Sequence, residues 1–576
     1  MIFFFRNFKK LLYIVGKKPH NITHIVILAI ISGSIDLIGF SIILPFIGII
    51  ISPENSPYIE NNFLLNFFDF SSTNSNFFLT LAILLILIFF LKAIIAIFSR
   101  VLIVSFAYKQ LAKLQTKLMS KYHEMNYLEY IKNSNSYYVR NIRDLSKGCI
   151  DALESSLKII AETLVVIIIL IYLAKLNFLA LVLLGLIIFS LAVIYNTIFK
   201  PISIKLGEKI SESFKNIYQR VNESIFGFKE IKINNKKDFF INQIKNDAEN
   251  IYKNTIKNYF ILVSPRYIFE VSIVIFVVFF IFISLNYLEI RNSLVPIIGV
   301  FAMACVRLMP SMTSILNDFT QLNFSKFAVD TCINDINIKN ENKNFSNIDT
   351  NLPFENITFK DVSFKYPGSN KEIFKKLDFK IFKNDCIAIV GPSGSGKTTL
   401  IDLFLGLLEP NSGEIIINNK KSNNANVLSY LSAYLPQDSL VIEDTIKKNI
   451  SLENKESEIN LDLINQSLED ANLKKFTDNL PNGIETIIGE NGIRLSGGQK
   501  QRLAIARNFY LKKEIIVLDE ATSSLDEENE ERIMDSLNNL KGKKTIILIT
   551  HKTKLLKNFK KIFSLKSGSL IEQNND

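Results

Sequence analysis

The residues Gly391-Pro392-Ser393-Gly394-Ser395-Gly396-Lys397-Thr398 decide the fold of the second half of this 576-residue chain. They follow the apolar, strand-like run 386–390 and match the pattern G-x-x-x-x-G-K-[ST]. Glycines in such a loop let backbone N–H groups close around phosphate oxygens, and the helix that follows adds its positive dipole end. Lys397 then brings charge to the β- and γ-phosphates, and the Thr398 hydroxyl, with Thr399 behind it, suits a nucleotide with its Mg²⁺. The stretch predicts a P-loop in an α/β domain.

Two adjacent carboxylates end a second strand-like run, 515–518. Side chains alternate in direction along a strand, so Asp519 and Glu520 have different tasks. We expect Asp519 to hold Mg²⁺, directly or through water. Glu520 is expected to polarise the attacking water as the general base. An Asp-Glu pair after a strand is weak evidence alone, but after a P-loop it is strong.

A third motif, Leu495-Ser496-Gly497-Gly498-Gln499, lies between the other two. With it, residues 354–576 resemble the nucleotide-binding domain of an ATP-binding cassette (ABC) protein. The resemblance implies that this motif opens a helix and points its backbone N–H groups at ATP held by the opposite domain, with Ser496 and Gly498 facing that nucleotide. Two ATP molecules would then be sandwiched head to tail, which implies a homodimer.

Four further residues match family elements one at a time. The resemblance implies that Tyr366 stacks on adenine and that Gln437 reaches Mg²⁺ and the attacking water. Asp526, in Ser524-Leu525-Asp526, would lie in the loop that crosses the dimer interface. His551 matches the switch histidine, which contacts the γ-phosphate and supports Glu520. Because Glu520 and His551 are both intact, two competent ATP sites are expected.

The composition indicates what this ATPase is coupled to. The chain is 48% hydrophobic and has a mean hydropathy of +0.23, which is too apolar for an ordinary soluble enzyme. Runs long enough to span the hydrocarbon core of a bilayer predict six transmembrane helices. They lie near residues 22–51, 77–107, 157–175, 177–199, 267–286 and 294–316.

The placement of lysine and arginine predicts the orientation in the membrane. Segment 52–76 has neither residue, whereas 108–148 and 200–257 are rich in both. Both termini are therefore expected in the cytoplasm, with the chain in the inner membrane of a bacterium. The net charge of +11 fits this positive-inside pattern, so no nucleic-acid partner is expected.

These features predict a half-transporter with the architecture of type I ABC exporters. Its fold class is an all-α six-helix transmembrane domain fused to an α/β P-loop cassette domain with a helical subdomain. Residues 1–20 are read as an interfacial elbow segment and 21–329 as the transmembrane domain. Residues 330–353 are rich in Asn and Lys and read as the linker to the cassette, 354–576.

Three cations lie in or beside the predicted spans, namely Lys92, Arg266 and Arg307. Charge in hydrocarbon is costly, so such residues usually face a cavity or a partner. If all three line one cavity, the cargo should carry compact negative charge such as a pyrophosphate. Alternatively, Arg266 snorkels to the cytoplasmic interface and Arg307 pairs with Asp36 or Glu270.

A second indication of the cargo is the external segment 58–70, where aromatic and aliphatic residues recur at near-helical spacing. It is typical of a short amphipathic helix at the outer membrane surface, or else of a loop packed on the first two spans. The lipid-facing residues of such a helix would be Phe63, Leu64, Phe67 and Phe68.

These features, with Ser264-Pro265-Arg266-Tyr267 and Arg307-Leu308-Met309-Pro310, are similar to bacterial lipid-linked oligosaccharide flippases of protein N-glycosylation. In that family the external helix handles the polyprenyl tail and cavity cations attract the pyrophosphate. The resemblance implies ATP-driven flipping of a polyprenyl-pyrophosphate-linked oligosaccharide to the periplasmic leaflet. The alternative is export of another amphipathic substrate, such as lipid A, a drug or a peptide.

Overall fold

The computed structural model of the chain describes residues 2–16, 23–35, 38, 75–176, 178–287, 294–338, 354–418, 420–421, 425–489, 492, 495–520, 526–557, 559–566 and 568–573. For some residues within these helices, Arg307 among them, it describes the backbone alone. The chain divides into two compact units. The first holds Met1–Met125 and Glu129–Asn340, and the second holds Glu341–Asp576 with Asn126–Leu128.

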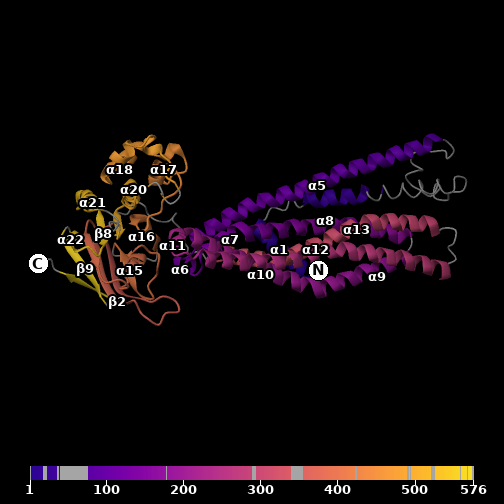
Figure 1. Cartoon of the computed structure of the whole chain (residues 1–576), viewed down its shortest axis with the longest axis horizontal. Coiled ribbons are helices and arrows are strands. Elements are labelled where there is room, and N and C mark those ends of the chain that lie inside the picture. Colours follow the sequence, from indigo (N-terminus) through magenta and orange to yellow (C-terminus); the bar gives the residue numbers. More distant parts are fainter. Residues whose placement is uncertain are drawn as a thin grey trace. The chain divides into compact units, whose positions relative to one another are not determined.

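The first unit is helical throughout its described residues (Figure 1). Long apolar runs with polar extensions give the long helices, because an apolar surface and a fully hydrogen-bonded backbone suit a bilayer. A further helix covers Thr23–Ile35. The labelled helices are α1 (Ile2–Val15), α5 (Ser75–Glu124), α6 (Tyr127–Tyr130), α7 (Asn135–Arg140), η1 (Asn141–Leu145), α8 (Ser146–Leu176), α9 (Phe178–Ile194), η2 (Tyr195–Phe199), α10 (Lys200–Phe226), α11 (Phe228–Ile233), α12 (Lys237–Tyr287), α13 (Leu294–Phe324) and α14 (Lys326–Ile336).

Five of the six predicted spans fall on these helices, with 77–107 inside α5 and 294–316 inside α13. The first span, 22–51, is helical where it is described, at 23–35. Within the described residues, three helical stretches are long and apolar enough to cross a membrane. They are Ala82–Glu124, Asn135–Lys175 and Lys237–Phe279.

Close packing holds the helices of this unit together. α8 and α13 lie side by side, and α10 packs along α12 and α13 (Figure 1). Val165, Ile169 and Leu308 belong to one buried cluster between such helices. At Gly207 of α10, a Cβ would lie 2.0 Å from the carbonyl oxygen of Phe324, so only glycine permits this approach of α10 to the end of α13.

The linker predicted from residue 330 begins inside helix α14, and the first unit continues to Asn340. Ala328, Val329, Cys332 and Ile336 are buried at helical spacing on one face of α14. Polar residues on the other face lower the apolar content of this segment, and for that reason its sequence resembles a linker. Residues 339–353 of the predicted linker lie outside the described residues.

The second unit is an α/β domain with two sheets. An antiparallel sheet has the order β2-β1-β4-β5, and a mainly parallel sheet has the order β10-β9-β3-β8-β7-β6. Strongly apolar runs give the central parallel strands, since they are buried on both faces. The strands are β1 (Asn356–Phe364), β2 (Phe374–Phe382), β3 (Cys386–Val390), β4 (Ser412–Ile417), β5 (Lys420–Lys421), β6 (Ser432–Leu435), β7 (Ile515–Asp519), β8 (Thr545–Ile549), β9 (Lys561–Lys566) and β10 (Ser569–Gln573).

Short helices complete this unit, and those between β6 and β7 form the predicted helical subdomain (Figure 1). α17 and α18 both pack on α20. The helices are α15 (Lys397–Phe404), α16 (Ala425–Leu431), α17 (Ile446–Ser451), η5 (Glu456–Glu458), α18 (Leu461–Asp470), α19 (Lys474–Asp478), η6 (Gly483–Glu485), α20 (Gly497–Tyr510), α21 (Glu527–Leu540) and α22 (Thr553–Leu556).

Candidate nucleotide site

The carboxyl ends of three neighbouring parallel strands gather the predicted site residues. β3 leads into the P-loop and α15, β7 ends at Asp519, and β8 is followed by Thr550 and His551. Together they border an open cleft. Among its lining residues are Pro392, Ser393, Gly394, Ser395, Gly396, Lys397, Thr398, Thr399, Gln437, Asp519, Glu520 and His551.

The P-loop needs glycine at two positions. Gly394 and Gly396 have φ angles of +75° and +102°, in the left-handed region that side chains disfavour. A Cβ on Gly396 would also lie 2.8 Å from Cγ2 of Ile373. The ammonium of Lys397 donates to the carbonyl oxygens of Gly391 and Pro392, each at 3.0 Å, so the loop holds this charge over its own backbone.

Glu520 and His551 form a direct contact at the edge of the sheet. His551 Nε2 lies 2.8 Å from Glu520 Oε1. Glu520 has a φ of +50°, unusual for a residue with a Cβ, and its N–H donates to the Ile549 carbonyl at 3.0 Å. That hydrogen bond fixes the turn after β7 and aims the carboxylate at His551. Strain of this kind is common at active sites.

Burial and neighbouring charges shift the pKa values of side chains in and near the cleft. Burial lowers the pKa of the Lys397 ammonium, while the nearby Glu520 and Asp519 carboxylates oppose this shift. Burial also raises the pKa of Asp519, aided by the charge of Glu520 and opposed by a hydrogen bond from Tyr434 Oη at 3.3 Å. Burial, with the charge of Asp519, raises the pKa of Asp402 in α15 to about 6. A bound cation would relieve this crowding of acids.

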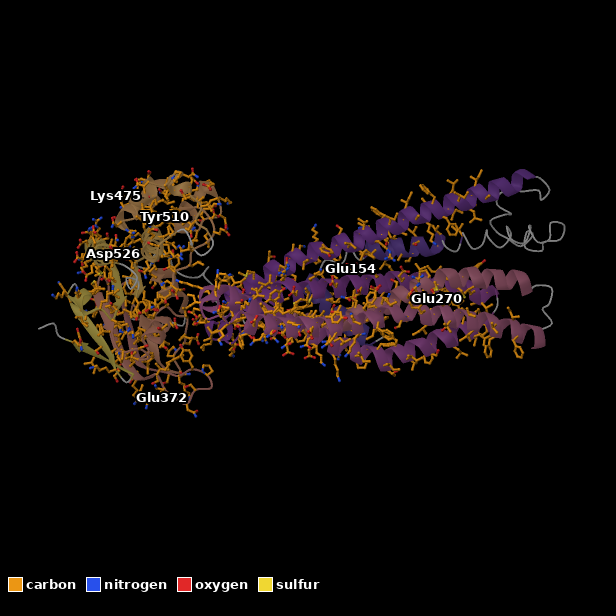
Figure 2. The ribbon with its side chains drawn as sticks, viewed as in Figure 1. Glu154, Glu270, Glu372, Lys475, Tyr510 and Asp526 are labelled. Carbon is orange, nitrogen blue, oxygen red and sulfur yellow. The ribbon has the colours of Figure 1, made fainter. Side chains whose placement is uncertain are left out.

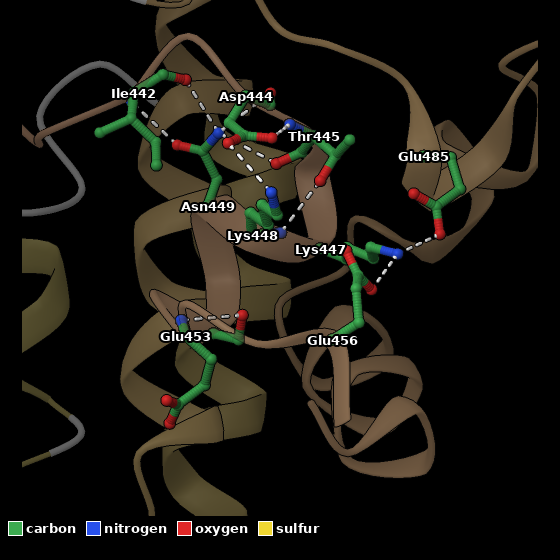
Figure 3. A network of polar contacts seen from close by, with 10 residues as sticks. Ile442, Asp444, Thr445, Lys447, Lys448, Asn449, Glu453, Glu456 and Glu485 are labelled. Carbon is green, nitrogen blue, oxygen red and sulfur yellow. Dashed lines mark hydrogen bonds and ion pairs between the residues drawn. The ribbon is translucent and has the colours of Figure 1, made fainter. Parts of the chain in front are cut away.

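A polar network fixes the chain that follows Gln437 (Figure 3). The fully buried Asn449 accepts from the Ile442 N–H at 2.9 Å, and its amide donates to the carbonyls of Ile442, Asp444 and Thr445. Lys447 also joins two loops, with 2.6 Å contacts to both Glu456 and Glu485. These contacts brace the start of α17, and therefore the loop that brings Gln437 to the cleft.

The third sequence motif caps helix α20. Ser496 Oγ accepts from the Gln499 N–H at 3.2 Å, and Gln499 Oε1 accepts from the Ser496 N–H at 2.8 Å. This capping box leaves Gly497 and Gly498 as the first helical residues, where backbone N–H groups suit an anion. None of these four residues lines the cleft described above. The motif therefore presents its helix end to something other than the P-loop of the same chain.

Comparisons with known proteins bear on the family. A family model described as the ABC transporter transmembrane region matches residues 22–311, which are 290 of 576 residues or about half of the chain. A second model, described as ABC transporter, matches residues 374–523. The chain belongs to the ABC transporters.

Two curated relatives of this ABC transporter illustrate the likeness. An ATP-dependent lipid A-core flippase of Ralstonia nicotianae is 37% identical over 219 residues, 38% of this chain and 37% of that protein. ABC transporter B family member 13 of Arabidopsis thaliana is 40% identical over 218 residues, 38% of this chain and 17% of that protein. The matches therefore span well under half of each relative.

A solved structure shares the whole fold of this ABC transporter. It is a bacterial Atm1-family ABC exporter with ATP bound, and it superposes with a TM-score of 0.80 at 19% identity. The superposition covers 97% of this chain and 96% of that chain. This confirms the predicted fold class, a helical transmembrane domain joined to an α/β nucleotide-binding domain.

Two further predicted cassette residues, Tyr366 and Asp526, are absent from the lining of the transporter's cleft. The Tyr366 hydroxyl is 3.4 Å from Thr399 Oγ1, and its ring packs edge-on against Phe364. Asp526 caps α21 and accepts from Asn529 at 2.6 Å (Figure 2). Ser524 and Leu525 lie outside the described residues.

Sequence reasoning missed the loop between β1 and β2 of the transporter. Its residues Ser369, Lys371 and Glu372 line the cleft (Figure 2 labels Glu372). The only sequence feature that marks this loop is a polar run after Tyr366, and such runs are common in surface turns.

Lys92 and Arg266, the two predicted cargo cations whose side chains are described, do not line one pocket. Lys92 lines a pocket with Arg100, whereas Arg266 is absent from that lining. Arg266 Nε instead donates to Glu270 Oε1 at 3.2 Å, one turn along α12 (Figure 2 labels Glu270). The side chain of Arg307 and the residues Phe63, Leu64, Phe67 and Phe68 lie outside the described parts.

Proposed function

We propose that the chain is one half of a homodimeric transporter that uses ATP to flip a polyprenyl-pyrophosphate-linked oligosaccharide from the cytoplasmic to the periplasmic leaflet. The observation that carries the ATPase part is the cleft where the P-loop, Asp519, Glu520 and His551 meet. We place the protein in a bacterial inner membrane with both termini in the cytoplasm, because lysine and arginine gather in 108–148 and 200–257.

In this proposal Glu520 takes a proton from the attacking water, and His551 holds that carboxylate at 2.8 Å in the required direction. Lys397 lies in the P-loop, where it would meet the β- and γ-phosphates. Mg²⁺ prefers hard oxygen ligands, and Thr398, Gln437 and Asp519 offer three in one cleft, so these residues would hold it. The ion would neutralise charge on the phosphates.

The placement of Ser496 and Gly498 supports the proposed homodimer. Both lie at the first turn of α20 and outside the cleft of their own chain. A second copy placed head to tail would bring this helix end to the γ-phosphate held by the first. Asp526 is proposed to lie at the same interface, and Tyr366 to stack on adenine.

The cargo assignment rests on charge within an apolar helical domain. Lys92 and Arg100 line an open pocket between long helices, which suits an anionic headgroup better than a neutral drug. A second candidate is a lipid A-type glycolipid, which also carries phosphate, and it is favoured by the similarity to proteins named lipid A-core flippases.

The test uses purified protein in proteoliposomes with fluorescent lipid-linked oligosaccharide in one set and fluorescent lipid A in another. ATP-dependent appearance of the oligosaccharide in the opposite leaflet supports the proposal. The Glu520→Gln variant provides the matched control without turnover. Flipping of lipid A alone, or transport of a drug or peptide in its place, contradicts it.

A further inference from the structure

A polar pocket lies among the helix at 23–35, α5 and α8. Six polar or charged residues contribute to its wall, namely Ser32, Lys92, Ser99, Arg100, Lys158 and Glu162. The remainder of the wall is alanine, valine and isoleucine. Three cations and one carboxylate around one cavity are unusual within helices of this hydropathy.

Acidic neighbours balance these cations in the structure. Lys158 contacts Glu154 at 2.6 Å, one turn along α8 (Figure 2 labels Glu154). Arg100 pairs with Glu162 across α5 and α8. This balance explains how the charges can lie among apolar helices.

Arg100 is held more weakly than Lys158. Its Nη2 lies 3.4 Å from Glu162 Oε1, a long single contact, although a guanidinium has a fork of N–H donors. Its side chain is 61% exposed, against 24% for Lys158. Glu162 also accepts from the Ser311 hydroxyl at 2.8 Å, so this carboxylate keeps a hydrogen bond if Arg100 turns away.

We propose that this pocket binds the diphosphate headgroup of the carrier lipid, with Arg100 as the exchangeable ligand and Glu162 as its internal competitor. Arg100 would turn from Glu162 to grip phosphate oxygens in a forked contact, while Lys158 and Lys92 supply charge from α8 and α5. The inference rests on the proposed function and revises its cation set, with Arg100 and Lys158 in place of Arg266.

The absence of tryptophan from the chain makes a direct binding test possible. The ring of Phe89 lies 5.2 Å from the Lys92 ammonium, so Phe89→Trp places a single indole beside the pocket. The full-length variant in phosphatidylcholine nanodiscs is titrated with farnesyl diphosphate and with farnesol. Saturable fluorescence change with the diphosphate, and none with the alcohol, is expected.

Substitutions in the Phe89→Trp background assign the ligands. Arg100→Ala and Lys158→Ala should each weaken binding of farnesyl diphosphate at least about tenfold, because each removes a charge-assisted contact. Arg100→Lys keeps the positive charge but loses the forked geometry of the guanidinium. Its affinity for farnesyl diphosphate should therefore lie between that of the parent and that of Arg100→Ala. Glu162→Gln should strengthen binding several-fold by removing the competitor. Lys109→Ala, on α5 but outside the pocket lining, is the matched control and should bind like the parent.

Unchanged affinity in both Arg100→Ala and Lys158→Ala overturns the inference, as does weaker binding in Glu162→Gln. Circular dichroism and the thermal unfolding midpoint of each variant show whether it is folded. The leaflet assay separates the two proposals. If the oligosaccharide is flipped but Arg100→Ala does not change diphosphate binding, the proposed pocket is rejected and the proposed function stands. If the variants change diphosphate binding as expected but the oligosaccharide is not flipped, the proposed function is rejected and the proposed pocket stands.

Discussion

His551 Nε2 lies 2.8 Å from Glu520 Oε1, although 31 positions separate the two residues in the chain. The contact is possible because β7 and β8 are parallel neighbours that end at the same edge of the sheet. It links the proposed general base to a residue that can hold it in place. Three predictions on the cassette follow from this edge of the sheet.

Glu520→Gln should keep ATP binding and lower the rate of hydrolysis by at least about 100-fold. The amide preserves the shape of the side chain but cannot accept the proton of the attacking water. Steady-state phosphate release and binding of a fluorescent ATP analogue measure the two properties. Hydrolysis at the parent rate would remove Glu520 from the role of base.

His551→Ala should lower kcat by about 100-fold with a smaller effect on KM, since it frees the Glu520 carboxylate to rotate. His123, which lies on α5 in the other unit, offers a control substitution of the same residue type. His123→Ala should hydrolyse ATP like the parent. A rise in KM alone after His551→Ala would mean that His551 only binds nucleotide.

Asp402→Asn should stabilise the protein in Mg²⁺-free, nucleotide-free buffer near pH 7.5. The pKa of Asp402 is raised to about 6, so the folded state holds its proton more tightly than the unfolded state does. Ionising it costs stability as the pH rises from about 4 to about 6, by at most about 3 kcal/mol. The gain in Tm of the variant should therefore vanish below about pH 4. Equal gains at pH 4 and pH 7.5 would contradict the assignment.

Much of the cassette could be predicted because its motifs are local. The spacing of Gly394, Gly396 and Lys397 after an apolar run specifies a phosphate loop, and parallel strands then bring Asp519 and His551 to that loop. Each step uses a pattern that can be read from a few neighbouring residues.

Other features depend on contacts between distant segments, which local patterns do not encode. The side-chain amide of Asn449 donates to the backbone carbonyls of Ile442 and Thr445, and no local sequence pattern predicts these hydrogen bonds. Arg100 and Lys158 were not singled out from the sequence, and the packing of α5 on α8 places them in one pocket. Arg266 pairs with Glu270 along its own helix, a contact that neither interpretation of the sequence included.

The central claim is that each ATP site is built from two copies of the chain, and one measurement tests it most directly. Ser496→Arg and Glu520→Gln are introduced into separate copies with different tags, co-expressed and purified through both tags. Each variant should be inactive as a homodimer. In the mixed dimer one site carries both changes and the other carries neither, so ATPase activity should return to roughly half of the parent value. A mixed dimer as inactive as the two homodimers would contradict the account.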